Sequence, residues 1–437
     1  MEDFLSNPNE ITAQIMLEKE PLEELVKKCA NENQAADILV LLFQLNRFNI
    51  VEAIGVEKLS DLLDVKYLQA PILENLRGIE LPDRDYSQLI SALFKIFVSE
   101  NIGAYKLAHS VLVSKFGPLL VTETYMNQYS TLLSNEDSVI KVRALELVIE
   151  LANLHNFEAF DNHGLISLGL SMITSGDILL QIVAIEVVID LGNSESGCKK
   201  LIDPQVLQVL NSAFEGQPDA NFRNRLVLMF ARIVHFTGNF TVIKENYWRT
   251  LQKMIEGTDV SAIKASLNSL GYLSSRPPGL TTILSKPDLL SELKSIQRSP
   301  NQSTKSHFYH FLSEFLPLLN EDQLILLNSH VQPVQPMINE LLNPFQELHS
   351  DILKAFIVLI GYESHALSIL SQNKFKEYLF KRPPHQVHQV SCLKFEIVER
   401  LNKHTLPQAL KTSCEKYLKA GVFAGPSDED VELDVMS

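Results

Sequence analysis

The chain has 437 residues, of which 46% are hydrophobic and 21% are charged, a composition typical of a folded protein with a large core. Its formal net charge of −15 argues against binding to nucleic acids or anionic membranes, because phosphate contacts need clustered Lys and Arg. The four cysteines lie far apart and none is in C-x-x-C spacing. We therefore expect reduced thiols and a cytoplasmic location, with the nucleus as a second candidate compartment.

Apolar residues recur at i, i+3, i+4 and i+7 along nearly the whole chain, and strict alternation is rare. This spacing predicts helices joined by short turns, and so an all-α fold. Residues 1–95 follow the pattern with weaker phasing, which predicts an N-terminal helical cap of atypical repeats. The acidic N-terminus carries no apolar signal segment, and the densest apolar runs, 38–43 and 356–360, are too short to cross a membrane.

An internal repeat occupies residues 96–424. Asp137–Leu151 aligns with Asp177–Leu191 at coincident Asp, Ala, Glu, Val, Ile and Leu positions. Similar segments begin at Asp219 and Asp259, so successive anchors are 40, 42 and 40 residues apart. A period of about 40 residues, with two or three helices in each repeat, is typical of HEAT and armadillo arrays. We therefore predict a right-handed armadillo/HEAT-like α-solenoid of about nine to eleven stacked repeats.

Each anchor residue is predicted to lie in a turn and to cap the helix that follows it, because an Asp or Asn side chain accepts hydrogen bonds from the free N–H groups of a first turn. Asn301 and Asn343 continue the series at steps of 42 residues. The last segment, 425–437, contains five acidic residues and no basic one, which predicts a disordered acidic tail.

No motif for a catalytic site stands out. The sequence has no G-x-x-x-x-G-K-[ST] phosphate loop, no G-x-S-x-G elbow and no H-E-x-x-H pair. His385, His388 and Cys392 could hold a zinc ion together with a fourth ligand, but a polar loop leading into a helix is the favoured interpretation. We expect no cofactor and no enzymatic activity, with an enzyme built on a helical scaffold as the alternative.

Two pairs of acidic residues recur at the same repeat positions. They are predicted to line the concave side of the solenoid, where stacked carboxylates would attract a basic partner. A solvated face without a partner is the alternative. Basic residues follow in the next repeat, and this change of sign would orient the partner. The candidate partner-binding residues are Glu146, Glu150, Glu186, Asp190, Arg225 and Arg232.

The C-terminal third carries a resemblance to a known family. The run Pro344–Phe356 fits P-F-x-E-L-H-x-x-x-L-K-x-F, with supporting similarities at Phe375–Tyr378, Lys394–Val398 and Tyr417–Gly421. These motifs resemble the 26S proteasome non-ATPase regulatory subunit 5 family, over roughly residues 100–426. Within the first motif, the spacing predicts core positions for Phe345, Leu348, Leu353 and Phe356 and leaves Glu347 and His349 as candidates for the surface.

The resemblance implies an armadillo/HEAT solenoid that acts as a chaperone in assembly of the proteasome regulatory-particle base. Such proteins bind the C-terminal domain of one base ATPase subunit and leave before the mature 26S particle is complete. The implied partners are proteasome ATPase subunits, with a large non-ATPase base subunit as a further candidate, and we expect a monomer. The alternative is a generic armadillo/HEAT adaptor or scaffold. Trp248 is the only tryptophan, so the Trp-x-x-x-Asn arrays of transport carriers are absent.

Overall fold

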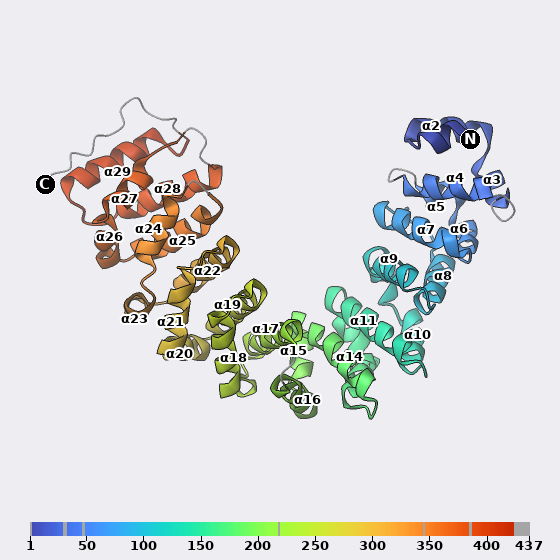
Figure 1. The fold of residues 1–437 in the computed structure, drawn as a ribbon, viewed down its shortest axis with the longest axis horizontal. Coiled ribbons are helices and arrows are strands. Elements are labelled where there is room, and N and C mark those ends of the chain that lie inside the picture. The colour runs from blue at the N-terminus through green and yellow to red at the C-terminus, as the bar shows by residue number, and fades with distance from the viewer. Residues whose placement is uncertain are drawn as a thin grey trace. The chain divides into compact units, whose positions relative to one another are not determined.

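The computed structural model describes residues 2–28, 33–45, 49–216, 219–343, 346–383 and 387–423. Every regular element in these ranges is an α-helix or a short 3-10 helix (Figure 1). The predicted all-α class is therefore confirmed. Within the same ranges, no helix combines the length and the apolar character needed to cross a lipid bilayer. The predicted acidic tail, 425–437, lies outside the described residues.

The chain forms two compact units, Met1–Gly197 and Cys198–Ser437, and the boundary falls inside α15 (Glu195–Leu201). The division predicted from repeat phase, at residues 95 and 424, stays a prediction. The helices of the first unit before α15 are α1 (Glu2–Ser6), α2 (Glu10–Lys19), α3 (Leu22–Lys28), α4 (Asn33–Gln44), α5 (Ile50–Ile54), α6 (Val56–Leu62), α7 (Lys66–Gly78), α8 (Ser87–Phe97), α9 (Ile102–Leu120), α10 (Glu123–Leu133), α11 (Ser138–Leu154), α12 (Phe157–Asn162), α13 (Leu165–Ser171), η1 (Met172–Thr174), α14 (Ile178–Val188) and η2 (Ile189–Asn193).

The second unit continues the same alternation of long helices and shorter ones. Its helices after α15 are α16 (Pro204–Glu215), α17 (Ala220–Thr237), η3 (Phe240–Val242), α18 (Glu245–Glu256), α19 (Val260–Ser274), α20 (Pro277–Leu284), α21 (Pro287–Ile296), α22 (Gln302–Phe315), η4 (Leu316–Leu318), α23 (Glu321–Val331), α24 (Val334–Leu341), η5 (Gln346–Leu348), α25 (His349–Ile360), α26 (Glu363–Leu370), α27 (Asn373–Phe380), α28 (His388–Leu401) and α29 (Gln408–Ala420).

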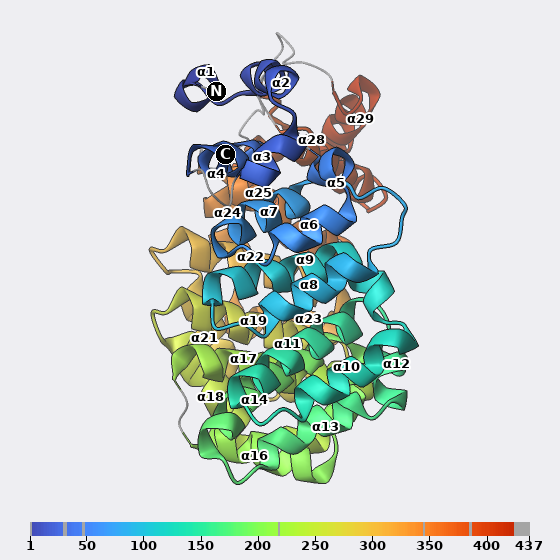
Figure 2. The ribbon, with the colours of Figure 1, turned by 90° about the vertical axis from the view of Figure 1, so that its right-hand side faces the viewer.

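One helix of each repeat packs against the corresponding helix of the next repeat, and we call these the ladder helices. In the first unit they are α4, α7, α9, α11 and α14, which follow one another in Figure 2. In the second unit they are α17, α19, α22, α25 and α28. The remaining helices form a second layer, in which α18 packs against α21 and α21 against α23. This arrangement confirms the solenoid architecture, while its right-handed sense stays a prediction.

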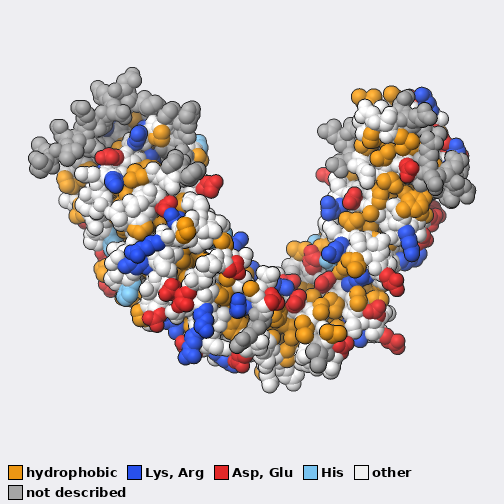
Figure 3. All heavy atoms as spheres, in the orientation of Figure 1, with side chains coloured by type: hydrophobic (Ala, Val, Ile, Leu, Met, Phe, Trp, Pro, Cys, Tyr) orange, Lys and Arg blue, Asp and Glu red, His pale blue; other side chains and the backbone are white. Residues whose placement is uncertain are grey.

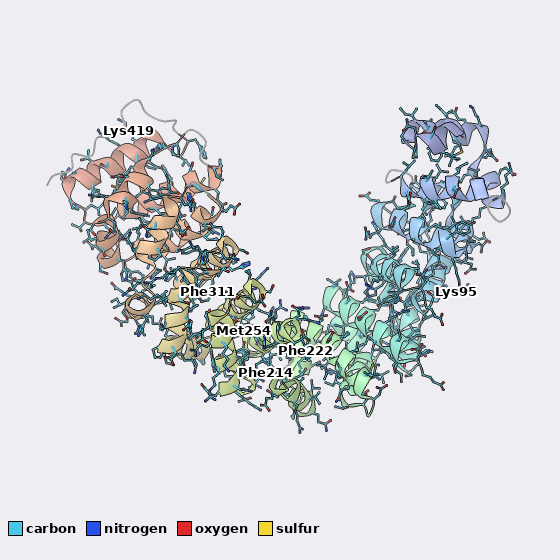
Figure 4. All side chains as sticks on the ribbon, in the orientation of Figure 1. Lys95, Phe214, Phe222, Met254, Phe311 and Lys419 are labelled. Carbon is cyan, nitrogen blue, oxygen red and sulfur yellow. The ribbon has the colours of Figure 1, made fainter. Side chains whose placement is uncertain are left out.

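A ladder helix is apolar on more than one side because it packs against two neighbouring ladder helices and against its own repeat. Helix α11, for example, buries most of the continuous run from Ala144 to Ala152. In the second unit, the ring of Phe214 from α16, labelled in Figure 4, lies 5.7 Å between centroids from the ring of Phe230 in α17, and the two rings pack edge-on. The buried hydroxyl of Tyr247 in α18 donates to the carbonyl oxygen of Val227, at 2.9 Å, so this phenol is paired inside the core.

The repeat anchors cap the ladder helices. Six side chains accept hydrogen bonds from N–H groups in the first turn of the helix that follows, and these are Asn101, Asp137, Asp177, Asp219, Asp259 and Asn301. The prediction that Asn343 caps the next ladder helix is wrong. Helix η5 intervenes, α25 begins at His349, and Asn343 instead offers its carbonyl oxygen to His349 Nε2 at 3.2 Å.

Candidate partner-binding face

Ladder helices α11 and α14 lie side by side in parallel, so equal repeat positions are neighbours. At their N-terminal ends, Ser138 Oγ lies 3.4 Å from Asp177 Oδ2. At their C-terminal ends, Asn153 Nδ2 donates to the carbonyl oxygen of Asp190 at 2.8 Å, and Ser194 Oγ donates to Asn153 Oδ1 at 2.7 Å. The recurrence of Glu146 and Glu150 at 186 and 190 therefore places four carboxylates across two adjacent helices. We call Glu146, Glu150, Glu186 and Asp190 the acidic row.

The first two members of the acidic row contact side chains of α9. Tyr105 donates its phenolic hydrogen to Glu146 Oε2 at 2.6 Å, and Glu146 is half-buried. Burial, and then the hydrogen bond from the phenol to Glu146, raise the pKa of Tyr105 above its usual value, so the phenol remains a donor at neutral pH. The exposed Glu150 has its Oε2 3.4 Å from His109 Nε2, without the geometry of a hydrogen bond.

His109 is uncharged at neutral pH. Burial lowers the pKa of its imidazole, and the opposing effect of Glu150 is smaller. The carboxylate of Glu150 is therefore not neutralised by a fixed positive charge in this contact. Glu186 and Asp190, in α14 and η2, are half-buried and both have interaction partners. Of the four predicted carboxylates, only Glu150 is exposed, with 47% of its side chain accessible, and the other three are half-buried.

Arg225 and Arg232 lie on α17 in the second unit, are half-buried and have interaction partners. The guanidinium carbon of Arg232 lies 5.5 Å from the ring centroid of Tyr272 in α19, a cation–π contact between successive repeats. Near the same helix ends, His235 Nδ1 lies 2.6 Å from Ser275 Oγ. This part of the second unit is tied together by contacts between repeats.

The face formed by α11 and α14 also carries exposed apolar side chains, which were not predicted from the sequence. Val139, Leu179, Ile182 and Val183 have exposed fractions of 56%, 77%, 51% and 42%, and we call these four residues the apolar zone. Hydrophobic side chains gather over α14 in Figure 3. The apolar residues of α14 are visible in the sequence, but they occur on every side of the helix. Such a helix is normally buried, so the sequence does not indicate that one side is exposed.

The metal-like cluster is only partly described. His385 lies outside the described residues, and His388 Nδ1 is 3.8 Å from Cys392 Sγ at the exposed start of α28. The ring of His388 stacks on Phe423, with 4.5 Å between centroids. Where residues are described, no group of three His, Cys, Asp or Glu side chains is placed to hold a metal ion.

The P-F-x-E-L-H motif forms part of the core of the second unit. Leu348, Leu353 and Phe356 are buried as predicted, while Pro344 and Phe345 lie outside the described residues. Glu347 is exposed. His349, a candidate for the surface, is instead buried. Its Nδ1 accepts from the phenol of Tyr378 at 3.1 Å, which together with the Asn343 contact assigns its hydrogen to Nε2.

A structure search supports the solenoid fold. An engineered protein solved by a structural genomics consortium has a TM-score of 0.52 and 17% sequence identity, with 87% of this chain and 98% of that chain covered. A designed armadillo repeat protein aligns with a TM-score of 0.35 and 12% identity, over 63% of this chain and all of that chain. At 17% identity the first match shows a similar fold and nothing about function. The TM-score of the second match is too low to show a shared fold.

Sequence comparison identifies a family. No curated protein sequence matches the chain significantly. A family profile described as "proteasome non-ATPase 26S subunit" matches residues 22–308, well over half of the chain. This range includes the acidic row and the apolar zone and ends before the P-F-x-E-L-H motif at residue 344. The chain therefore belongs to the proteasome non-ATPase 26S subunit family.

Proposed function

We propose that this protein is a chaperone for assembly of the proteasome regulatory-particle base, and that it acts by binding rather than by catalysis. In this proposal the ladder face of α9, α11 and α14 holds the C-terminal domain of a base ATPase subunit. The bound chaperone blocks premature contacts of that domain, and subunits that join later displace it. Family membership supports a role connected with the proteasome, and the motifs at 344–356, 375–378, 394–398 and 417–421 support the narrower assignment.

The observation that carries the proposal is the acidic row on two parallel ladder helices. Stacked carboxylates raise the negative potential of a surface, which attracts a basic partner and speeds its association. Glu146 is held in place from α9 by the hydrogen bond from Tyr105, so this member of the row is pre-ordered before a partner arrives. Pre-ordered side chains lose less conformational entropy on binding.

A tagged pull-down from native cell lysate, identified by mass spectrometry, tests the proposal. We expect recovery of a subset of base ATPases, with or without a large non-ATPase base subunit, and without core-particle subunits. Recovery of whole proteasomes would instead show a stable subunit of the mature particle. Absence of every proteasome subunit would reject the proposal and favour a generic adaptor with another partner.

Charge reversal then tests the face. Replacing Glu146, Glu150, Glu186 and Asp190 with Lys should weaken binding of the recovered ATPase without unfolding the chain. A control that reverses Glu123 and Glu158, exposed residues of α10 and α12 in the second layer, should bind as the wild type does. If the wild type, the four-residue variant and the control bind the ATPase with equal affinity, the acidic row is a solvated face that contacts no partner.

A further inference from the structure

The apolar zone is a group of solvent-exposed hydrophobic side chains on α11 and α14. On α14, Leu179, Ile182 and Val183 have the spacing i, i+3 and i+4, and Glu186 follows at i+7, so all four lie on one face of the helix. In a ladder helix of this kind, an apolar stripe is normally buried against another element. Contiguous exposed apolar side chains mark interaction sites more often than scattered ones do.

Val139 extends the zone onto the neighbouring helix. It occupies the repeat position in α11 that Leu179 occupies in α14, two residues after the capping Asp in each case. The caps lie close together, as the 3.4 Å distance between Ser138 Oγ and Asp177 Oδ2 shows. The apolar zone therefore spans the N-terminal halves of two adjacent helices, while the acidic row crosses their C-terminal halves.

The distance between the zone and the row fits one helix of a partner. Leu179 and Glu186 are seven residues apart on α14, which corresponds to about 10 Å along the axis. A helix with its side chains has a diameter of about 10–12 Å. A helix that lies across α11 and α14 would thus contact the apolar zone with one flank and the acidic row with the other.

We propose that this face of the first unit binds an amphipathic helix whose apolar stripe covers Val139, Leu179, Ile182 and Val183 and whose basic flank faces the acidic row. A purely basic segment would leave the apolar side chains in water, and a purely apolar one would desolvate the exposed carboxylate of Glu150 without bringing a cation to it. The chain's own acidic tail, 425–437, is disfavoured because it carries the same sign of charge as the row. The proposal refines the proposed function by defining which kind of ATPase segment is held.

The first test uses the full-length chain and a fluorescently labelled synthetic helix with a Leu stripe and a Lys flank. Anisotropy should show binding that weakens as salt is added, and a peptide with Glu in place of Lys should not bind. The Leu179→Ser/Ile182→Ser variant should bind the Leu/Lys peptide about tenfold more weakly or worse, because two large aliphatic contacts are lost. Ile325→Ser, at a 53% exposed position of α23 in the second unit, is the matched control and should not change the affinity.

Three outcomes would overturn the inference. The double variant could bind the Leu/Lys peptide as tightly as the wild type, or the Leu/Lys and Leu/Glu peptides could bind equally well. The double variant could also unfold at a clearly lower temperature than Ile325→Ser, which would assign the apolar zone to packing within the chain.

Purified C-terminal domains of the base ATPases separate this inference from the proposed function. If one domain binds the wild type and is weakened by Leu179→Ser/Ile182→Ser, both are supported. If a domain binds the wild type and the double variant equally, the chaperone function stands and the helix-binding inference fails. If the peptide results are as expected but no ATPase domain binds, the inference stands and the proposed partner is wrong.

Discussion

The phenol of Tyr105 donates a hydrogen bond to the carboxylate of Glu146, 2.6 Å away on the next ladder helix. One face of the same ring is covered by the guanidinium of the buried Arg143, whose central carbon lies 4.1 Å from the ring centroid. Arg143 in turn donates to the carbonyl oxygens of Phe97 and Ser99 at the end of α8, at 3.0 and 2.7 Å. A half-buried acidic residue, Glu146, is thus connected through one ring to a cation that caps a second-layer helix.

Replacement of Tyr105 by Phe should therefore lower the free energy of unfolding. The change removes one hydrogen bond to a charged, half-buried carboxylate, which costs about 1.5–3 kcal/mol. Urea denaturation at pH 6 and pH 8 should give the same loss, because the raised pKa of the Tyr105 phenol keeps it protonated at both values. A loss that appears at only one pH would contradict this account.

His349 should make the second unit sensitive to mild acid. Burial lowers the pKa of its imidazole below the ordinary value of about 6.5, despite hydrogen bonds to the backbone. As the pH falls below about 6.5, the unfolded chain gains a proton before the folded chain does, so the free energy of unfolding falls. Protonation at Nδ1 would also remove the acceptor that Tyr378 uses.

The His349→Gln variant should lose less stability than the wild type between pH 7 and pH 5, measured by urea denaturation at each pH. The variant cannot take up a proton at this position, so its difference from the wild type should shrink toward the acid end of the range. Parallel pH profiles for the two proteins would show that His349 does not titrate in this window.

Local chemistry accounts for what could be predicted from the sequence. An Asp cap bonds to N–H groups two or three residues away, so the anchors at 137, 177, 219 and 259 could be recognised without a structure. The prediction that Asn343 caps a helix was wrong because η5 lies between Asn343 and the next ladder helix. The α9 neighbours of Glu146 and Glu150 come from the preceding repeat. Helix α9 starts at Ile102, only 36 residues before α11, so the period of about 40 residues did not align Tyr105 with the acidic row.

The apolar zone could not be predicted for a different reason. A helix that is apolar on all sides gives no indication of which side lies against its neighbours, and only the packing of α14 shows that Leu179, Ile182 and Val183 are exposed. Lys394 is the reverse case. It looks like an ordinary surface cation in the sequence, and only the tertiary structure places its ammonium group inside the second unit.

Removal of a repeat anchor should destabilise the chain by a predictable amount. Asp219 Oδ1 accepts hydrogen bonds from the backbone N–H groups of Asn221 and Phe222, at 2.9 and 3.2 Å. Asp219→Ala should lower the free energy of unfolding by about 1 kcal/mol, whereas Asp219→Ser keeps an acceptor and should cost less. Equal losses in the two variants would mean that the carboxylate does not act as a cap.

Replacement by alanine should lower the free energy of unfolding at one glycine and raise it at another. A Cβ at Gly279, in α20, would lie 2.1 Å from the carbonyl oxygen of Leu273 at the end of α19, which neither backbone can accommodate without moving. Gly279→Ala should therefore destabilise the chain by about 1–3 kcal/mol. At Gly271, within α19, a Cβ would meet no atom within 4 Å, so Gly271→Ala should stabilise by about 0.5–1 kcal/mol through helix propensity. Thermal unfolding of both variants beside the wild type measures the two shifts.

Lys394 should make the chain more stable at alkaline pH than at neutral pH. Its side chain is buried, and its Nζ donates to the carbonyl oxygens of Tyr378 and Lys381 at 2.7 and 3.0 Å, at the end of α27. Burial, with smaller contributions from Arg382 and Lys381, lowers the pKa of this amine to about 7. A neutral amine still has two hydrogens, enough for both carbonyl groups, so loss of the charge does not break the cap.

The sign of the effect follows from the two pKa values. Between about pH 7 and the ordinary lysine pKa of about 10.4, the unfolded chain holds a proton that the folded chain lacks, so the free energy of unfolding rises with pH. Lys394→Met keeps the aliphatic volume and removes the amine. The variant should be about 1–3 kcal/mol less stable than the wild type at pH 9, because two carbonyl groups lose their donor, and the difference should be smaller at pH 7. A difference that stays constant from pH 7 to pH 9 would show that the amine of Lys394 keeps its proton in the folded chain.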